Sequence, residues 1–202
     1  MVGYGLSMPS AEIDTRRHIL DTAEVLMARK GYTAVGLTEV LSEAAVPKGS
    51  FYYYFSSKEA FGEALMQSYF TEYLATMDRI AGDTSKTGAE QLGEYWQRFY
   101  DLQSFDDGQG KCLVVKLAAE VSDLSEPMRR QLVDGTAGII DHLARMITNG
   151  TTDGSLSVDE DPRSLAQELY EAWLGASIMA KVQRTPESLR RTLDRTKVRL
   201  NL

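Results

Sequence analysis

The sequence is poor in the residues that build metal centres and covalent cross-links. Its 202 residues include a single cysteine, Cys112, and only two histidines. One cysteine cannot form an intramolecular disulfide, which excludes a disulfide scaffold and favours a reducing cytoplasm. So few histidine and cysteine side chains also argue against a structural zinc site, and we expect no metal and no cofactor.

Long apolar runs and catalytic motifs are missing as well. No segment approaches the roughly 20 apolar residues that a membrane span requires, and residues 1–10 lack the basic and apolar regions of a signal peptide. The chain contains no glycine-rich phosphate loop, no Gly-x-Ser-x-Gly and no His-Glu-x-x-His. We therefore expect a cytoplasmic protein that is neither an enzyme nor a membrane protein.

The charge is distributed unevenly along the chain. The net charge of −7 argues at first against a nucleic-acid partner. Residues 14–60, however, carry six basic and six acidic side chains, so most of the acidic excess lies in residues 61–202. A neutral N-terminal module on an acidic body can still bind DNA through a few well-placed cations and helix N-termini.

Proline is scarce, and the apolar residues recur at helical spacing nearly throughout. Four of the five prolines stand where a helix can begin, and no segment alternates like a strand for more than a few residues. The sequence therefore predicts an all-α protein with a long loop over residues 149–161. We expect helices from Asp14 or Thr15 to Lys30, over 37–45, over 48–55, from a cap at Ser56 or Ser57 to Gly82, and over 89–104, 110–122, 127–148, 162–183 and 186–198.

Two short predicted helices joined by a break at Val46-Pro47 form a helix-turn-helix pattern, whose second helix can enter the DNA major groove. In that helix Phe51 and Phe55 share one face, which can pack on the preceding helices. The opposite and flanking positions carry groups that suit phosphate oxygens and base edges: Gly49, Ser50, Tyr52, Tyr53 and Tyr54. Lys48 and Lys58, at either side of the helix, are placed to neutralise phosphates.

The stretch GYTAVGLTEVLSEAAVPKGSFYYYFSSKEAF resembles the DNA-binding domain of the TetR family of transcriptional repressors, over roughly residues 14–61. Carried over position by position, the resemblance implies DNA contacts at Thr38, Lys48, Gly49, Ser50, Tyr52, Tyr53, Tyr54 and Lys58. Three departures leave the base preference open: Gly36 replaces a frequent Ser or Thr cap, Tyr54 replaces a frequent His, and Pro47 lies at the turn.

The resemblance also implies a domain plan. Residues 1–13 form an N-terminal arm, 14–61 the helix-turn-helix DNA-binding domain, and 62–202 the effector-binding and dimerisation domain. In that family the helices at 127–148 and 162–183 pair with their copies in a four-helix bundle. A two-fold homodimer then reads a palindromic operator in double-stranded DNA and is released by a small molecule.

Residues 110–129 and 173–181 resemble, more narrowly, the subgroup that includes the N-ethylmaleimide reductase repressor. That resemblance implies sensing of electrophiles or oxidants through Cys112. The start of a helix favours a thiolate, and Lys111 and Lys116 lie close in sequence. Two alternatives stay open: a non-covalent organic ligand with Cys112 as packing, and a helical interaction protein without a DNA role.

Four further residues of the body are candidates for an effector cavity: Lys181, Trp173, Trp96 and Tyr100. Lys181 ends a largely apolar helix, on the face that carries Trp173, and can reach into such a cavity. A lysine in the last turn also complements the helix dipole, and aromatic residues at helical spacing are typical of a core. Both interpretations stay open.

Overall fold

The computed structural model describes residues 10–104 and 112–202, with side chains from residue 14 onward. All regular secondary structure in these residues is helical, which confirms the all-α prediction. The described helices are α1 (Ser10–Lys30), α2 (Leu37–Glu43), α3 (Lys48–Tyr54), α4 (Lys58–Ala81), α5 (Gly88–Gln103), α6 (Leu113–Leu124), α7 (Glu126–Asp153), α8 (Pro162–Gln183) and α9 (Glu187–Leu200).

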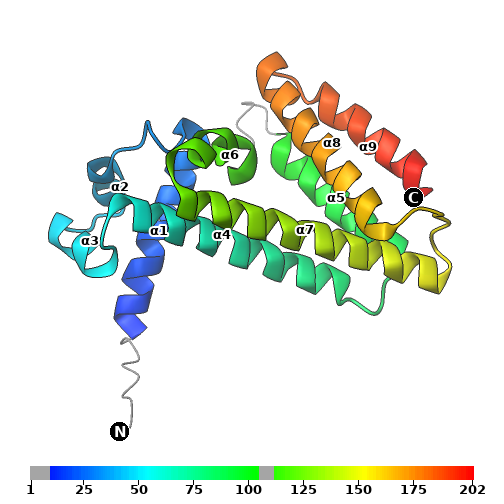
Figure 1. The fold of residues 1–202 in the computed structure, drawn as a ribbon, viewed down its shortest axis with the longest axis horizontal. Helices are drawn as coiled ribbons and strands as arrows, with labels where there is room; N and C mark the ends of the chain where they lie inside the picture. The colour runs from blue at the N-terminus through cyan, green and yellow to red at the C-terminus, as the bar shows by residue number, and fades with distance from the viewer. Residues whose placement is uncertain (1–9, 105–111) are drawn as a thin grey trace, which may run out of the picture.

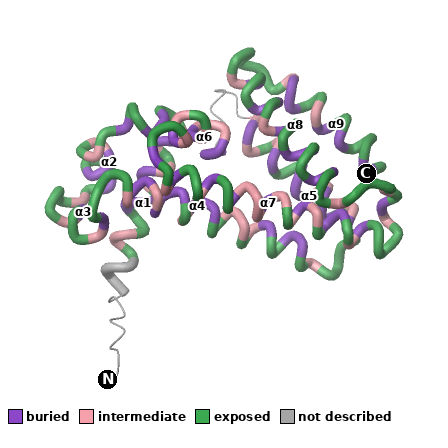
Figure 2. The backbone as a smooth tube through the Cα atoms, in the orientation of Figure 1, coloured by how far each residue is buried: buried purple, intermediate pink, exposed green. Residues whose placement is uncertain are grey.

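The helices form a small module at one end and a larger body beside it. Helices α2 and α3 lie at one end of the molecule, braced by α1, whereas α8 and α9 lie at the other (Figure 1). The long helix α4 runs from the module into the body, where it packs along α7. Buried residues line the inner faces of the helices in both parts (Figure 2). The module that contains α2 and α3 is therefore joined to the body by α4, a helix that packs within the body.

Local sequence signals explain most helix boundaries. Gly31, which follows α1, has a φ of 92°, a conformation that glycine adopts without strain. The side chain of Ser57 accepts a hydrogen bond from the amide of Ala60 and caps α4, as the sequence predicts. Thr87 and Glu90 form a capping box at the start of α5.

The predicted starts of two helices are wrong by several residues. Helix α1 begins at Ser10 rather than at Asp14 or Thr15; residues 10–13 contain no helix breaker, and serine is itself favoured at a helix start. Helix α6 begins at Leu113 rather than at residue 110, and residues 105–111 lie outside the described part of the chain.

Helix α7 reaches Asp153, so the loop expected over residues 149–161 is shorter. The reason is a close crossing of two helices: a Cβ atom on Gly88 would lie 2.1 Å from the backbone nitrogen of Gly150. The missing side chain of Gly88 thus lets the start of α5 lie against the backbone of α7 at Gly150, which is inside the helix and does not end it. The stop is supplied by Gly154, which has a φ of 79°. Among the described helices, none combines the length and apolarity needed to cross a membrane.

Candidate DNA-binding surface and the Cys112 cavity

Helix α3 is fastened to the module by two phenylalanines. Phe51 is fully buried and Phe55 is nearly so. Their rings lie 5.3 Å and 4.9 Å from the ring of Phe61, at the start of α4, in edge-to-face contacts. The apolar face predicted from the sequence is therefore the buried one, and it fixes which side chains of α3 face outward.

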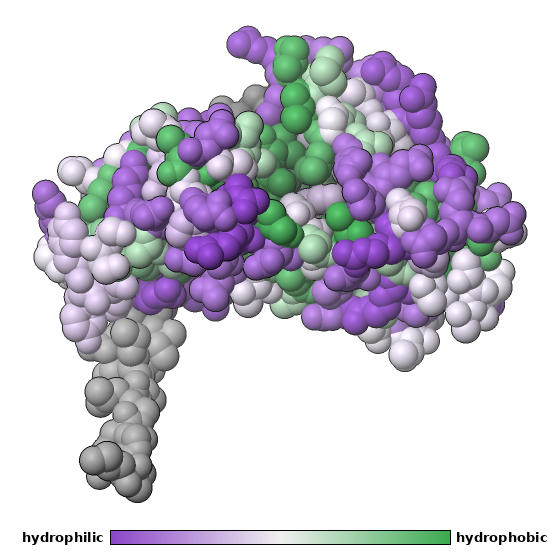
Figure 3. Space-filling model, in the orientation of Figure 1, coloured by the Kyte–Doolittle hydropathy of each residue, from purple (hydrophilic) through white to green (hydrophobic). Residues whose placement is uncertain are grey.

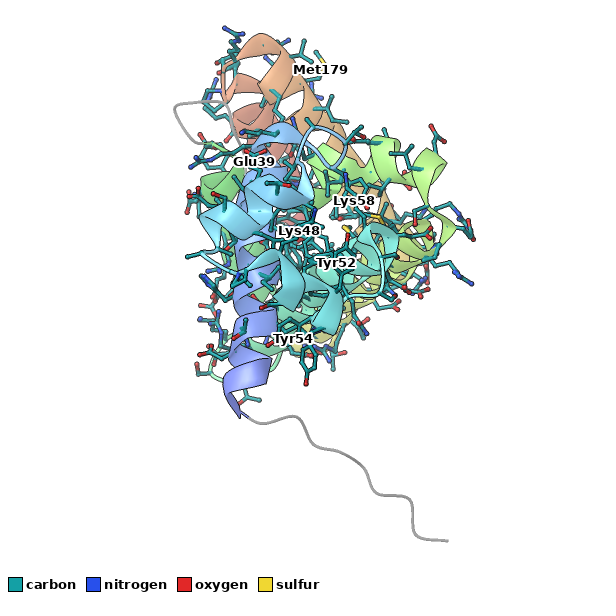
Figure 4. The ribbon with its side chains drawn as sticks, turned by 90° about the vertical axis from the view of Figure 1, so that its left-hand side faces the viewer. Glu39, Lys48, Tyr52, Tyr54, Lys58 and Met179 are labelled. Atoms are coloured by element: carbon teal, nitrogen blue, oxygen red, sulfur yellow. The ribbon has the colours of Figure 1, made fainter. Side chains whose placement is uncertain are left out.

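The outward face of α3 is aromatic and polar. Tyr52 and Tyr53 are 60% and 62% exposed, and the rings of Tyr53 and Tyr54 meet edge-on at 5.0 Å. Lys48 and Gly49 are exposed, whereas Ser50 and Tyr54 are half-buried. Seen from this end of the molecule, Lys48, Tyr52, Tyr54 and Lys58 lie together on the face toward the viewer (Figure 4).

A shallow groove of about 380 Å³ separates α2 from the start of α3, and Thr38, Ser42 and Lys48 are among its lining residues. The turn beneath it is unusual, because Ala45 has a φ of 53°, a left-handed conformation that costs free energy for any residue with a Cβ atom. The amide of Val46 donates to the carbonyl of Leu41 at 2.9 Å and closes the turn. Pro47, with a φ of −60°, then directs the chain into α3.

Lys58 lies at the first position of α4 and is exposed. Its ammonium is 4.9 Å from the centroid of the Tyr32 ring and donates to the carbonyl of Val35 at 3.4 Å. The hydroxyl of Tyr32 in turn donates to the carbonyl of Lys58 at 3.0 Å. The structure thus gathers the predicted DNA contacts, from Thr38 to Lys58, at one end of the molecule.

Cys112 is the residue that immediately precedes α6, and only 6% of its surface is exposed. The hydroxyl of Tyr69 on α4 donates to its Sγ at 3.8 Å. Burial raises the pKa of the thiol, and this outweighs the backbone N–H groups of Val115 and Val114, the Tyr69 hydroxyl and the charge of Lys181, which all favour the thiolate. The helix start predicted to lower this pKa is therefore present, but desolvation is stronger.

Lys181 is the cation that acts on this thiol. It is half-buried in the last turn of α8, and burial, together with the charge of Lys116, lowers its pKa, while Cys112 acts in the opposite direction. The sequence directed attention to Lys111 and Lys116 as the neighbours of the thiol. Lys111 lies outside the described residues, and only the fold brings Lys181, from a distant helix, into the electrostatic environment of Cys112.

A cavity of about 230 Å³ opens beside Cys112, between the module and the body. Its lining combines aromatic and charged side chains, with Tyr69, Tyr73, Phe99, Glu24, Glu72 and Arg98 among the lining residues. A smaller cavity of about 70 Å³ shares Tyr73, Arg98 and Phe99 with it. Burial, and then the charges of Glu72 and Asp21, raise the pKa of Glu24. Because Glu24 belongs to α1, an occupant of this cavity contacts both parts of the molecule.

The tryptophans predicted as cavity candidates lie elsewhere. Trp96 and Trp173 are fully buried and stack on each other at 5.0 Å with an angle of 11° between their planes. The indole N–H of Trp173 donates to the hydroxyl of Thr196 at 3.0 Å. Neither tryptophan, nor the half-buried Tyr100, nor Lys181 lines the cavity beside Cys112 or the smaller one next to it. Tyr73 and Arg98 line both cavities and Tyr69 lines the larger one, but helical spacing alone gave no signal that separates them from core or surface residues.

Two helices of the body, α7 and α8, expose apolar side chains. Met179 and Val182 on α8 are 44% and 70% exposed, Ile178 is 50% exposed, and Val133 on α7 is 51% exposed. Hydrophobic residues gather over the upper part of α8 (Figure 3), and Met179 lies on the same helix, away from α3 (Figure 4). Ala172 and Gly175 continue this exposed strip of α8 with small side chains.

Comparison with known proteins agrees with this architecture. Residues 19–65 match the family "Bacterial regulatory proteins, tetR family", and residues 88–195 match "Tetracyclin repressor-like, C-terminal domain". The chain is 39% identical to the transcriptional repressor NemR of Escherichia coli K12 over 186 residues, which cover 92% of this chain and 94% of that protein. It is 31% identical to the repressor DhaR of a Mycobacterium species over 179 residues, 89% and 88% of the two chains.

The fold comparison gives the same result. The crystal structure of the reduced form of E. coli NemR superposes with a TM-score of 0.87 at 40% identity, over 93% of this chain and 97% of that one. The relatives are transcriptional repressors and not enzymes. The chain therefore belongs to the TetR family and is a DNA-binding transcription regulator.

Proposed function

We propose that the chain represses transcription as a homodimer on a palindromic operator, with one α3 in the major groove of each half-site, and that a signal at the body releases it. The observation that carries this proposal is the division of α3 into a buried phenylalanine face and an exposed face of tyrosines beside Lys48. The first test is fluorescence anisotropy with the DNA upstream of the chain's own gene, at stated salt.

The outward residues of α2, α3 and the start of α4 divide by chemistry. Lys48, Thr38 and Lys58 contact phosphates, which fixes the position of the module on DNA. Ser50 and Tyr53 reach base edges or phosphate oxygens, with Tyr52 and Tyr54 on either side, and Gly49 allows the backbone to approach closely. Replacing Ser50 or Tyr53 with alanine removes operator binding while the fold is kept. Unchanged binding by both variants would contradict this assignment.

The exposed apolar face of α7 and α8 is the proposed dimer interface. Exposed side chains such as Met179 and Val182 are buried when the two helices pair with their copies, and apolar burial is the main driving force for association. Met179→Asp places a charge in that interface and yields a monomer in sedimentation velocity. Val198→Asp on α9 is the matched control, because Val198 is 83% exposed on another helix. A Met179→Asp variant that stays dimeric would exclude this face.

Cys112 is the proposed sensor of electrophiles or oxidants. It lines the 230 Å³ cavity, so a small reagent can reach it without unfolding the helix. The nearby charge of Lys181 partly offsets the burial that disfavours the thiolate. With N-ethylmaleimide, the thiolate sulfur adds to the ring double bond and the neighbouring carbon takes up a proton. A bulky adduct at the first residue before α6 then changes how the body holds the DNA-binding module.

A non-covalent organic ligand in the same cavity is the alternative, with Cys112 as a packing residue. The cavity supports it, because aromatic and charged groups converge there without the thiol. Cys112→Ser separates the two: a covalent sensor loses its response to N-ethylmaleimide, whereas a ligand-operated regulator keeps its response to its ligand. An alkylated wild-type protein that still binds the operator would favour the non-covalent alternative.

A further inference from the structure

One carboxylate of α6 forms hydrogen bonds with the DNA-binding module. Glu120 lies on α6, eight residues and about 12 Å beyond Cys112, which immediately precedes the helix. Its Oε2 accepts a hydrogen bond from the backbone amide of Tyr32 at 3.0 Å, and its Oε1 accepts one from the amide of Thr33 at 2.6 Å. The hydroxyl of Thr33 also donates to Oε1. Three donors from the segment that follows α1 thus converge on a single side chain of the body.

The backbone at this point is shaped to receive the carboxylate. Gly31 has a φ of 92°, and a Cβ atom there would lie 3.0 Å from Oε2 of Glu120. The absence of a side chain therefore lets the carboxylate reach the two amides beyond the end of α1. Tyr32 is buried, so its amide needs an acceptor, and Glu120 supplies one to it and to the amide of the exposed Thr33. Although partial burial raises the pKa of Glu120, the hydrogen bonds from Thr33 and Tyr32 lower it more, so the carboxylate is charged near neutral pH.

The contact continues from Tyr32 to the recognition helix. The Tyr32 ring lies under the ammonium of Lys58, and its hydroxyl donates to the Lys58 carbonyl. Lys58 starts α4, directly after the turn that ends α3. A Cβ atom on Gly62 would lie 2.9 Å from the Tyr32 ring, so this ring packs tightly against α4. Two side chains, Glu120 and Tyr32, therefore connect the helix that follows Cys112 to the base of α3.

We propose that Glu120 is a positioning residue for operator binding. Its carboxylate fixes the position of the DNA-binding module relative to α6, and it transmits a displacement at the Cys112 end of α6 to the module. This inference rests on the proposed function of Cys112 and of α3. A hydrogen bond weakens steeply when the donor–acceptor distance and angle leave their narrow preferred range. A small displacement of α6 thus releases the amides of Tyr32 and Thr33.

The test compares wild type with Glu120→Gln and Asp123→Asn. Glutamine keeps the size of Glu120, but it has one acceptor oxygen, and its NH₂ group faces a backbone donor that it cannot satisfy. Asp123→Asn removes the same charge from an exposed position of the same helix and is the matched control. Each protein is titrated with the DNA upstream of its own gene, before and after N-ethylmaleimide treatment. Mass spectrometry measures alkylation of Cys112, and thermal unfolding checks the fold.

Wild type and Asp123→Asn are expected to lose at least about fivefold in operator affinity on alkylation, the lower range of coupling between sites. Glu120→Gln is expected to bind weakly before treatment, to be alkylated to the same extent, and to show a Kd ratio near one. A residue that served only the fold would not change this ratio. Thr33→Val, which removes one donor and keeps both amides, is expected to fall between wild type and Glu120→Gln, and it serves as the test if Glu120→Gln does not fold.

The outcomes separate this inference from the proposed function. Glu120→Gln with the Kd and the Kd ratio of wild type would overturn the role of Glu120 and leave the sensor intact. A wild-type protein that binds the operator equally well before and after alkylation would refute the Cys112 sensor. The Kd of Glu120→Gln without alkylation would then test the role of Glu120. Weaker binding than wild type supports the positioning role, and equal binding overturns it. A wild type that does not bind the operator would refute both.

Discussion

The turn between α2 and α3 offers a test in which two neighbouring alanines respond with opposite signs. Ala45 has a φ of 53°, whereas Ala44 has a φ of −73° and is 3% exposed. A left-handed alanine costs about 1–2 kcal/mol, and glycine avoids this cost at an entropic penalty of about 0.5–1 kcal/mol. Ala45→Gly is therefore expected to stabilise the protein by about 0.5–1 kcal/mol.

Ala44→Gly gains nothing from backbone freedom, because its φ is ordinary. It loses a buried methyl group, worth about 0.8 kcal/mol, and adds the same entropic penalty, so it is expected to destabilise the fold by about 1–2 kcal/mol. Thermal unfolding at a fixed protein concentration measures both variants. For a chain of this size, 1 kcal/mol corresponds to about 2–4 °C in Tm. Destabilisation by Ala45→Gly of the same size as by Ala44→Gly would refute the argument from backbone strain.

Three further predictions test the packing, the electrostatics and the DNA surface. Gly88→Ala is expected to destabilise the fold by about 1–3 kcal/mol or more, because its Cβ would lie 2.1 Å from the backbone nitrogen of Gly150; an unchanged Tm would contradict the close crossing. The pKa of Glu120 is lowered in the fold, so the contribution of this carboxylate to stability is complete above the usual carboxyl pKa and is lost as the pH falls through the lowered value. The stability of Glu120→Gln, measured by unfolding at several pH values, should lack this acid-dependent loss. Identical pH profiles for wild type and Glu120→Gln would exclude the contribution. Lys48→Ala is expected to reduce the slope of log K against log salt by about 1.8, because each of the two subunits loses one phosphate contact worth about 0.9, whereas Lys197→Ala on α9 should leave the slope unchanged; equal slopes in both variants would remove Lys48 from the interface.

Local signals predicted the DNA-binding module well, because its residues interact mainly with close neighbours in sequence. The four-residue spacing of Phe51 and Phe55 identified the buried face of α3, and the cap at Ser57 and the stop at Gly31 set helix ends. The family assignment confirms the predicted DNA-binding class and removes the alternative of a helical interaction protein without a DNA role.

The surroundings of Cys112 could not be predicted, because they depend on contacts between distant helices. The charge of Lys181 on α8 acts on the thiol, and the hydroxyl of Tyr69 on α4 donates a hydrogen bond to it. Glu120 is a charged residue in a helical pattern, and no sequence feature separates it from a solvated one. The extension of α7 beyond residue 149 likewise depends on the crossing at Gly88, where tertiary packing overrides the tendency of Asn149-Gly150 to break a helix.

Operator binding before and after alkylation tests the proposed thiol-operated repressor most directly. Wild type and Cys112→Ser are titrated by fluorescence anisotropy against the DNA upstream of the chain's own gene, with and without N-ethylmaleimide, at one stated salt concentration. We expect tight binding by both proteins, abolished by the treatment in wild type only. Tight binding that survives alkylation of wild-type Cys112 would contradict the sensor, and the absence of binding by either protein would contradict the proposed operator.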